Sequence, residues 1–69
     1  METNMDEKIQ KKYHEALQKI ETEGLPFSMK VAELTFKEAE TLRYELMNKN
    51  LRVNIYEEFK ELYLGVYEK

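Results

Sequence analysis

The sequence predicts a small α+β domain in which two helices and a three-stranded mixed sheet follow one another in the order α-β-α-β-β. Two stretches carry apolar residues at helical spacing, and three shorter stretches alternate apolar and polar residues. A Gly and a Pro, at 24 and 26, separate the first helical stretch from the rest. Because 69 residues support one domain at most, residues 1–69 are interpreted as a single small domain.

Residues 5–23 form the first predicted helix. Its apolar stripe follows the spacing i, i+4, i+7, i+8, i+11 and consists of Ile9, Tyr13, Ala16, Leu17 and Ile20. Asn4 and Glu7 have the spacing of a capping box at the start of this helix. Gly24 is placed to cap its C-terminus, and Pro26 prevents the helix from continuing.

A short strand is predicted at residues 27–33, where apolar and polar residues alternate. Its apolar positions are Phe27, Met29 and Val31. The alternation ends at Leu34, and Thr35 and Glu38 then form a T-x-x-E capping box. Helical spacing of apolar residues follows, which predicts a second helix over residues 36–48.

The last nineteen residues, LRVNIYEEFKELYLGVYEK, fit two periods. A hairpin with its loop near Glu57–Glu61 places every aliphatic residue on one face, and Val, Ile and Tyr favour strands. A helix over residues 54–67 is the alternative, and it would make the fold mostly α. That helix would contain Gly65, at a cost of about 1 kcal/mol. We favour the hairpin, although EEFKE lacks the Gly, Asn or Pro that usually specifies a turn.

In the predicted topology, the first strand, second helix and second strand form a right-handed crossover with parallel strands. The third strand then pairs antiparallel with the second. The face beneath the second helix is expected to carry Phe27, Met29, Val31, Leu51, Val53, Ile55, Leu62, Leu64 and Val66.

The opposite face of the hairpin brings three tyrosines together, Tyr56, Tyr63 and Tyr67, with Arg52 beside them. Tyrosine suits interfaces because it offers a large apolar area, a hydroxyl group and few rotatable bonds. Three interpretations are open for this face: the first helix covers it, a second copy covers it, or a partner protein binds it. If the tail is helical, Tyr63 turns inward and the face does not exist.

Three acids, Glu57, Glu58 and Glu61, form the densest acidic cluster of the chain. At a hairpin loop they are interpreted either as a solvated turn or as a charged rim that engages basic residues of a partner.

Composition argues against catalysis. The chain has no Cys, one His (His14), one Ser and no glycine-rich phosphate loop, so we expect no enzyme activity, no cofactor and no metal site. Charged residues make up 36% of the chain, but the net charge is only −3 and no basic stripe is present, so the sequence argues against nucleic acid as the partner. With no signal peptide and no apolar run long enough to span a bilayer, we expect a cytoplasmic protein with no membrane contact.

These observations lead to a functional hypothesis: a non-catalytic protein-binding module, an inhibitor or modulator that occupies a surface of a host enzyme or regulator. The expected partner-binding residues are Tyr56, Tyr63, Tyr67, Arg52, Glu57, Glu58 and Glu61. The alternatives are a nucleic-acid-associated accessory or regulatory protein that uses the hairpin and Arg52, and a self-assembling structural subunit such as a homodimer.

Overall fold

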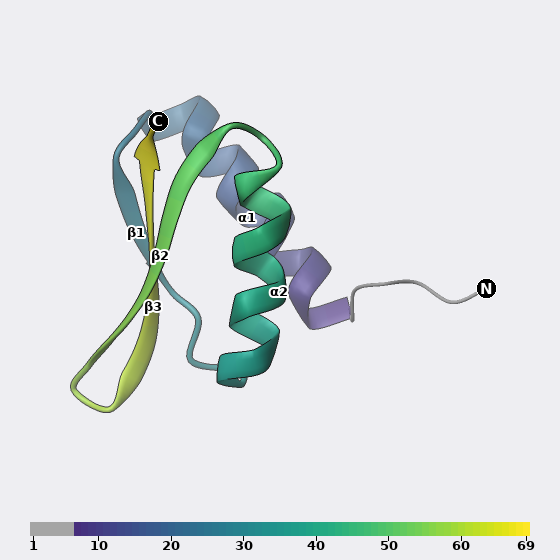
Figure 1. The fold of residues 1–69 in the computed structure, drawn as a ribbon, viewed down its shortest axis with the longest axis vertical. Helices are drawn as coiled ribbons and strands as arrows, with labels where there is room; N and C mark the ends of the chain where they lie inside the picture. Colours follow the sequence, from purple (N-terminus) through teal and green to yellow (C-terminus); the bar gives the residue numbers. More distant parts are fainter. Residues whose placement is uncertain (1–6) are drawn as a thin grey trace.

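A computed structural model describes residues 7–69 and confirms the small α+β fold with the predicted order of elements. The elements are α1 (Glu7–Glu23), β1 (Phe27–Lys30), α2 (Phe36–Met47), β2 (Leu51–Glu58) and β3 (Glu61–Glu68). They form two layers, a sheet and a pair of helices that lie on one side of it (Figure 1). Asn4, the predicted cap of the first helix, lies outside the described residues.

Helix α1 ends where the sequence predicts. Gly24 has φ of 78°, the left-handed conformation that glycine adopts without steric cost. Its N–H donates to the carbonyl oxygens of Lys19 and Ile20 at 3.2 and 3.1 Å. The bond to Ile20 satisfies one of the four carbonyl groups that the end of the helix leaves unpaired.

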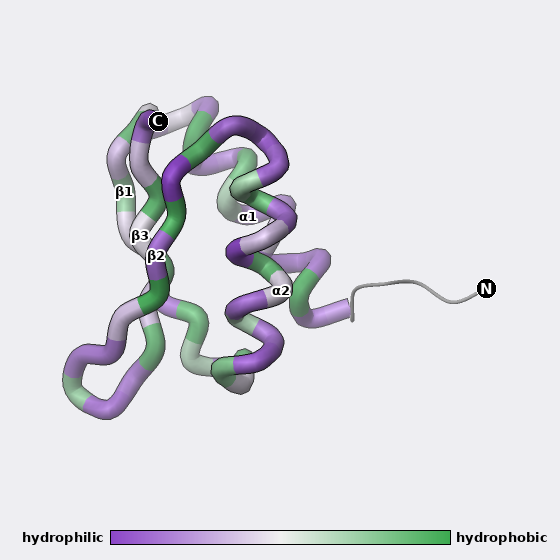
Figure 2. Tube along the Cα trace, in the orientation of Figure 1, coloured by the Kyte–Doolittle hydropathy of each residue, from purple (hydrophilic) through white to green (hydrophobic). Residues whose placement is uncertain are grey.

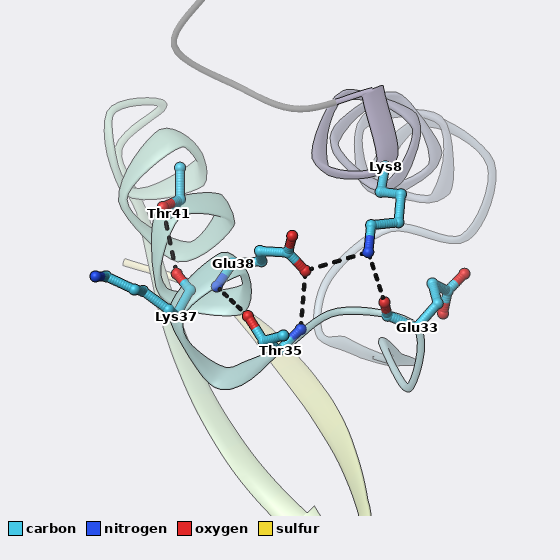
Figure 3. Close-up of polar contacts among 6 residues, drawn as sticks. All are labelled: Lys8, Glu33, Thr35, Lys37, Glu38 and Thr41. Carbon is cyan, nitrogen blue, oxygen red and sulfur yellow. Dashed lines mark hydrogen bonds and ion pairs between the residues drawn. The ribbon is translucent and has the colours of Figure 1, made fainter.

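The predicted capping box at the start of α2 is present. The Glu38 N–H donates to Thr35 Oγ1 at 3.1 Å, and the Thr35 N–H donates to Glu38 Oε1 at 2.9 Å (Figure 3). Lys8 of α1 reaches the same region, donating to the Glu33 carbonyl oxygen at 3.4 Å and lying 3.5 Å from Glu38 Oε1. These contacts join the N-terminal turns of the two helices.

The tail is a hairpin, and the helical alternative for residues 54–67 is wrong. Its strands pair from Leu51↔Glu68 to Glu58↔Glu61, which leaves only Phe59 and Lys60 as the turn. Both turn residues have positive φ, 53° and 64°, as a type I′ turn requires. The predicted loop near Glu57–Glu61 thus contracts to two residues, because the strand pairing continues to its very end.

The strand order differs from the predicted one. The order is β1-β3-β2 and both pairs are antiparallel, so the sheet is antiparallel, not mixed. Strands β1 and β2 do run parallel, but β3 lies between them, as in a split β-α-β unit. The central place suits β3 because it holds the buried run Leu64–Val66, and a central strand is covered on both edges.

Strand β1 is shorter than predicted and ends at Lys30. Val31 still donates its N–H to the Leu62 carbonyl oxygen at 2.9 Å, after which the chain turns toward α2. Residues Ala32 and Glu33 are exposed in this connection.

The core lies between the sheet and the helices. Its fully or nearly fully buried members are Ile9, Ala16, Met29, Val31, Leu34, Ala39, Leu42, Leu46, Val53, Leu64 and Val66. The predicted inner-face residues Phe27, Leu51, Ile55 and Leu62 pack against this core and are half-buried. Hydrophobic and hydrophilic residues alternate along β2, which is how an antiparallel sheet with one covered face is built (Figure 2).

Candidate functional site

One face of the sheet carries the three predicted tyrosines, and no described element covers it. We call this surface the tyrosine face and define it by Ser28, Lys30, Arg52, Asn54, Tyr56, Tyr63, Gly65 and Tyr67. Among residues 7–69, α1 contacts α2 and β1 but neither β2 nor β3, and α2 packs on the opposite, core side. The interpretation in which the first helix covers the tyrosines is therefore wrong.

Tyr56 and Tyr63 form the centre of the tyrosine face. They are directly opposite each other on β2 and β3, and their rings stack with centroids 5.5 Å apart and planes 13° from parallel. The Tyr56 hydroxyl donates to Ser28 Oγ of β1 at 3.0 Å, so this side chain reaches across the central strand. Because the stack and the hydrogen bond hold the rings in place, little side-chain freedom remains to be lost on binding.

Tyr67 extends the face along β3, opposite Arg52. Between Tyr63 and Tyr67 the sequence has Gly65, and this position is not an empty recess. A Cβ atom there would lie 2.5 Å from Asn54 Oδ1 and 2.9 Å from the Tyr67 hydroxyl oxygen. The ends of the Asn54 and Tyr67 side chains fill the space above Gly65, so a side chain at this position would displace them.

The three predicted acids do not form one cluster. Glu61 pairs with Lys30 across β3 and β1 at 3.0 Å, and this hydrogen bond and charge raise the pKa of Lys30 above its ordinary value. Glu58 pairs with Glu61 in the strand register and lies on the same side of the sheet. Glu57 pairs with Leu62 and so points to the side that carries the helices. Only Glu58 and Glu61 can therefore border the tyrosine face.

Sequence reasoning missed Phe59. This side chain is 88% exposed at the tip of the hairpin, the highest exposure among the large apolar residues of the described chain. If every residue of Leu51–Glu58 pairs with a residue of Glu61–Glu68, only Phe59 and Lys60 remain for the turn, so full pairing of the strands would have identified Phe59 as a tip residue. The sequence did not suggest this two-residue turn because it has no Gly or Asn at these positions.

The free edge of β2 is partly occupied. Arg43 of α2 donates its Nε–H to the Val53 carbonyl oxygen at 3.1 Å. A shallow groove runs beside this contact and is lined by Phe36, Glu40, Arg43, Asn54 and Ile55. The arginine takes up an edge acceptor that another strand would otherwise use.

The single histidine and the acidic side chains of residues 7–69 do not converge on a metal site. His14 is exposed on α1 beside the Tyr13 ring. No group of three or more His, Asp or Glu side chains in this part of the chain is arranged to hold a metal ion. None of the described helices is long and apolar enough to span a bilayer.

No protein-family model, curated protein or solved structure matches the chain. The geometry of the tyrosine face and of the hairpin tip is therefore what points to a function.

Proposed function

We propose that this protein is a non-catalytic protein-binding module that acts in the cytoplasm as an inhibitor or modulator, by occupying a surface of an enzyme or regulator. The observation that carries the proposal is the uncovered tyrosine face: both helices pack on one side of the sheet, and Tyr56, Tyr63 and Tyr67 lie on the other.

The composition of this face suits a protein partner. Aromatic rings supply apolar area, while their hydroxyl groups keep the unbound surface hydrated. Arg52 is exposed at the margin of the face and makes no ion pair within residues 7–69, which leaves its guanidinium group available to a partner carboxylate or carbonyl group. Hot-spot residues of interfaces are enriched in Tyr and Arg, the two residue types gathered here.

A nucleic-acid partner fits this face less well. Of its two cations, Lys30 is already paired with Glu61. Glu58, which has no ion pair within residues 7–69, adds a negative charge nearby. Phosphate contacts need clustered free cations.

The proposal can be tested by affinity capture with the full chain immobilised, using nuclease-treated lysate of the cells in which the protein is made. Wild type is compared with Tyr63→Glu, which places a charge in the ring stack. Tyr44→Glu is the matched control, because Tyr44 is 60% exposed on α2, away from the tyrosine face. We expect one protein that wild type and the control retain and that Tyr63→Glu loses by at least about tenfold, the loss of roughly 1.4 kcal/mol.

A partner that is retained from untreated lysate but lost after nuclease treatment, and whose retention weakens steeply with salt, would support the accessory-protein alternative instead. Recovery of the protein itself alone, with a mass in sedimentation that falls from dimer to monomer in Tyr63→Glu, would support the self-assembling alternative. Equal retention by all three chains would contradict a role for the tyrosine face.

A further inference from the structure

The tip of the β2–β3 hairpin is the second surface that folding alone does not explain. The hairpin extends past the helices, so its turn projects away from the rest of the domain (Figure 1). Phe59, at the first turn position, is 88% exposed and belongs to neither the core nor the residues packed against it. An isolated phenylalanine so exposed contributes no burial to the folded state.

The backbone at the tip adds a second cost. Phe59 and Lys60 have φ of 53° and 64°, where a side chain with a Cβ atom is sterically disfavoured. Asn-Gly is the pair that this turn prefers, and it would also be more soluble. Phe59 therefore combines an unfavourable conformation with an unfavourable exposure, a combination that marks functional positions.

We propose that Phe59 is the anchor of a protein contact: it inserts into an apolar pocket whose rim carries Lys or Arg side chains. The acids beside the tip define that rim. Glu57 and Glu58 are exposed on opposite sides of the hairpin, and neither has an ion pair within residues 7–69. A basic rim on the partner would therefore meet them as the ring enters the pocket. This inference rests on the proposed function, since it assumes a protein partner and specifies its chemistry.

Other occupants of this tip fit less well. An anionic membrane surface would repel Glu57 and Glu58, and Lys60 is the only cation of the turn. A second copy offers two hollows within residues 7–69, and neither is both apolar and positively bordered. The groove beside α2 carries one positive and one negative side chain, Arg43 and Glu40. The hollow on α1 is lined only by polar and charged side chains, Glu7, Lys8, Gln10, Lys11 and His14. A partner protein with an apolar, positively bordered pocket is the occupant that the charges favour.

The first test measures stability and needs no partner. In the full chain, Phe59→Asn combined with Lys60→Gly is expected to raise Tm by at least about 4 °C, because it relieves the turn. Thermal unfolding followed by circular dichroism gives Tm. An unchanged or lower Tm would show that Phe59 imposes no cost on the fold, and would overturn the proposal.

The second test identifies the contact. Phe59 is replaced by the photo-reactive p-benzoylphenylalanine in the full chain, and the same substitution at Tyr44 is the matched control. In lysate we expect one adduct with a single protein from position 59 only. Glu57→Lys combined with Glu58→Lys should reduce its yield at least about tenfold, and the cross-linked peptide should lie beside Lys or Arg residues.

Each other outcome is decisive. No adduct, an adduct with the protein itself, recovery on phosphatidylglycerol vesicles alone, or an adduct unaffected by the charge reversal would overturn the proposal. If Tyr63→Glu loses a partner that position 59 never cross-links, the proposed function stands and the tip anchor fails. If the position-59 adduct persists in Tyr63→Glu, the tip stands and the tyrosine face fails.

Discussion

Lys12 links α1 to the connection that precedes α2. Its side chain is 13% exposed, and its Nζ lies 3.1 Å from Glu33 Oε2 and 3.3 Å from Glu15 Oε1. Burial lowers the pKa of Lys12, but hydrogen bonds to Glu33 and Glu15 outweigh burial and leave the pKa above its ordinary value. The pKa of Glu33 lies below its ordinary value, mainly because the backbone N–H of Glu33 donates a hydrogen bond to its carboxylate. Burial raises this pKa, and Lys12 lowers it further.

These shifts predict how stability depends on pH. Because the folded pKa of Glu33 is lowered, its contribution is fully present above the ordinary pKa of about 4.3 and is lost as pH falls through the folded value. Because the folded pKa of Lys12 is raised, the contribution of Lys12 to stability is present below about pH 10.4. It is lost as pH rises through the folded pKa. Between these limits Glu33→Gln should cost at most about 1 kcal/mol, because the Glu33 side chain is 53% exposed.

The measurement is Tm of wild type and Glu33→Gln from pH 3 to pH 7. The difference between them should shrink below about pH 4.3. Glu21→Gln, on the exposed surface of α1, is the control and should show no such trend. A difference that grows as pH falls would contradict the assigned pKa direction of Glu33.

At the scale of elements, the capping box makes α2 dependent on one hydroxyl group. Thr35→Ala removes the hydroxyl group that accepts a hydrogen bond from the Glu38 N–H, and we expect a loss of about 1 kcal/mol in the free energy of unfolding. Urea denaturation measures it as a lower midpoint at unchanged slope. Thr22→Ala, which removes an exposed hydroxyl group within α1, should change the midpoint little. Equal effects of the two substitutions would argue against the cap.

The elements themselves could be predicted because their signals are local. Spacing of apolar residues, the Thr35 box and Gly24 act within a few residues of the chain, and all agree with the structure. The hairpin turn was harder to predict. Phe59 and Lys60 take positive φ because the flanking strands stay paired up to Glu58 and Glu61, so the cause is the register of the sheet and not the turn residues.

At the scale of the molecule, the order of strands and the place of α1 could not be predicted. An alternating strand shows that one face is buried, but not which neighbour it pairs with. The stripe from Ile9 to Ile20 likewise shows that α1 packs on something, and it fits the tyrosine face as well as it fits α2. The residues of the candidate face follow from alternation alone, whereas their exposure depends on this long-range choice.

The central strand should carry much of the stability. Leu64 is fully buried on β3, so Leu64→Ala removes its contacts and leaves a cavity. A loss of roughly 2–5 kcal/mol is expected, which approaches the whole stability of a domain of this size. Leu17→Ala, at a half-buried position on α1, should cost clearly less. Urea titration followed by circular dichroism gives the unfolding midpoint of each variant. A folded Leu64→Ala chain with an unchanged midpoint would contradict the assignment of Leu64 to the core.

The position of β3 also has a consequence for synthesis of the chain. Within residues 7–69, β1 and β2 each have β3 as their sole strand neighbour, and β3 is made after both. During synthesis, the first two strands are therefore made before the strand with which both of them pair. The sheet can assemble only once residues 61–68 are available, because they pair with β2 on one edge of β3 and with β1 on the other. A chain truncated before residue 61 is therefore expected to lack this sheet.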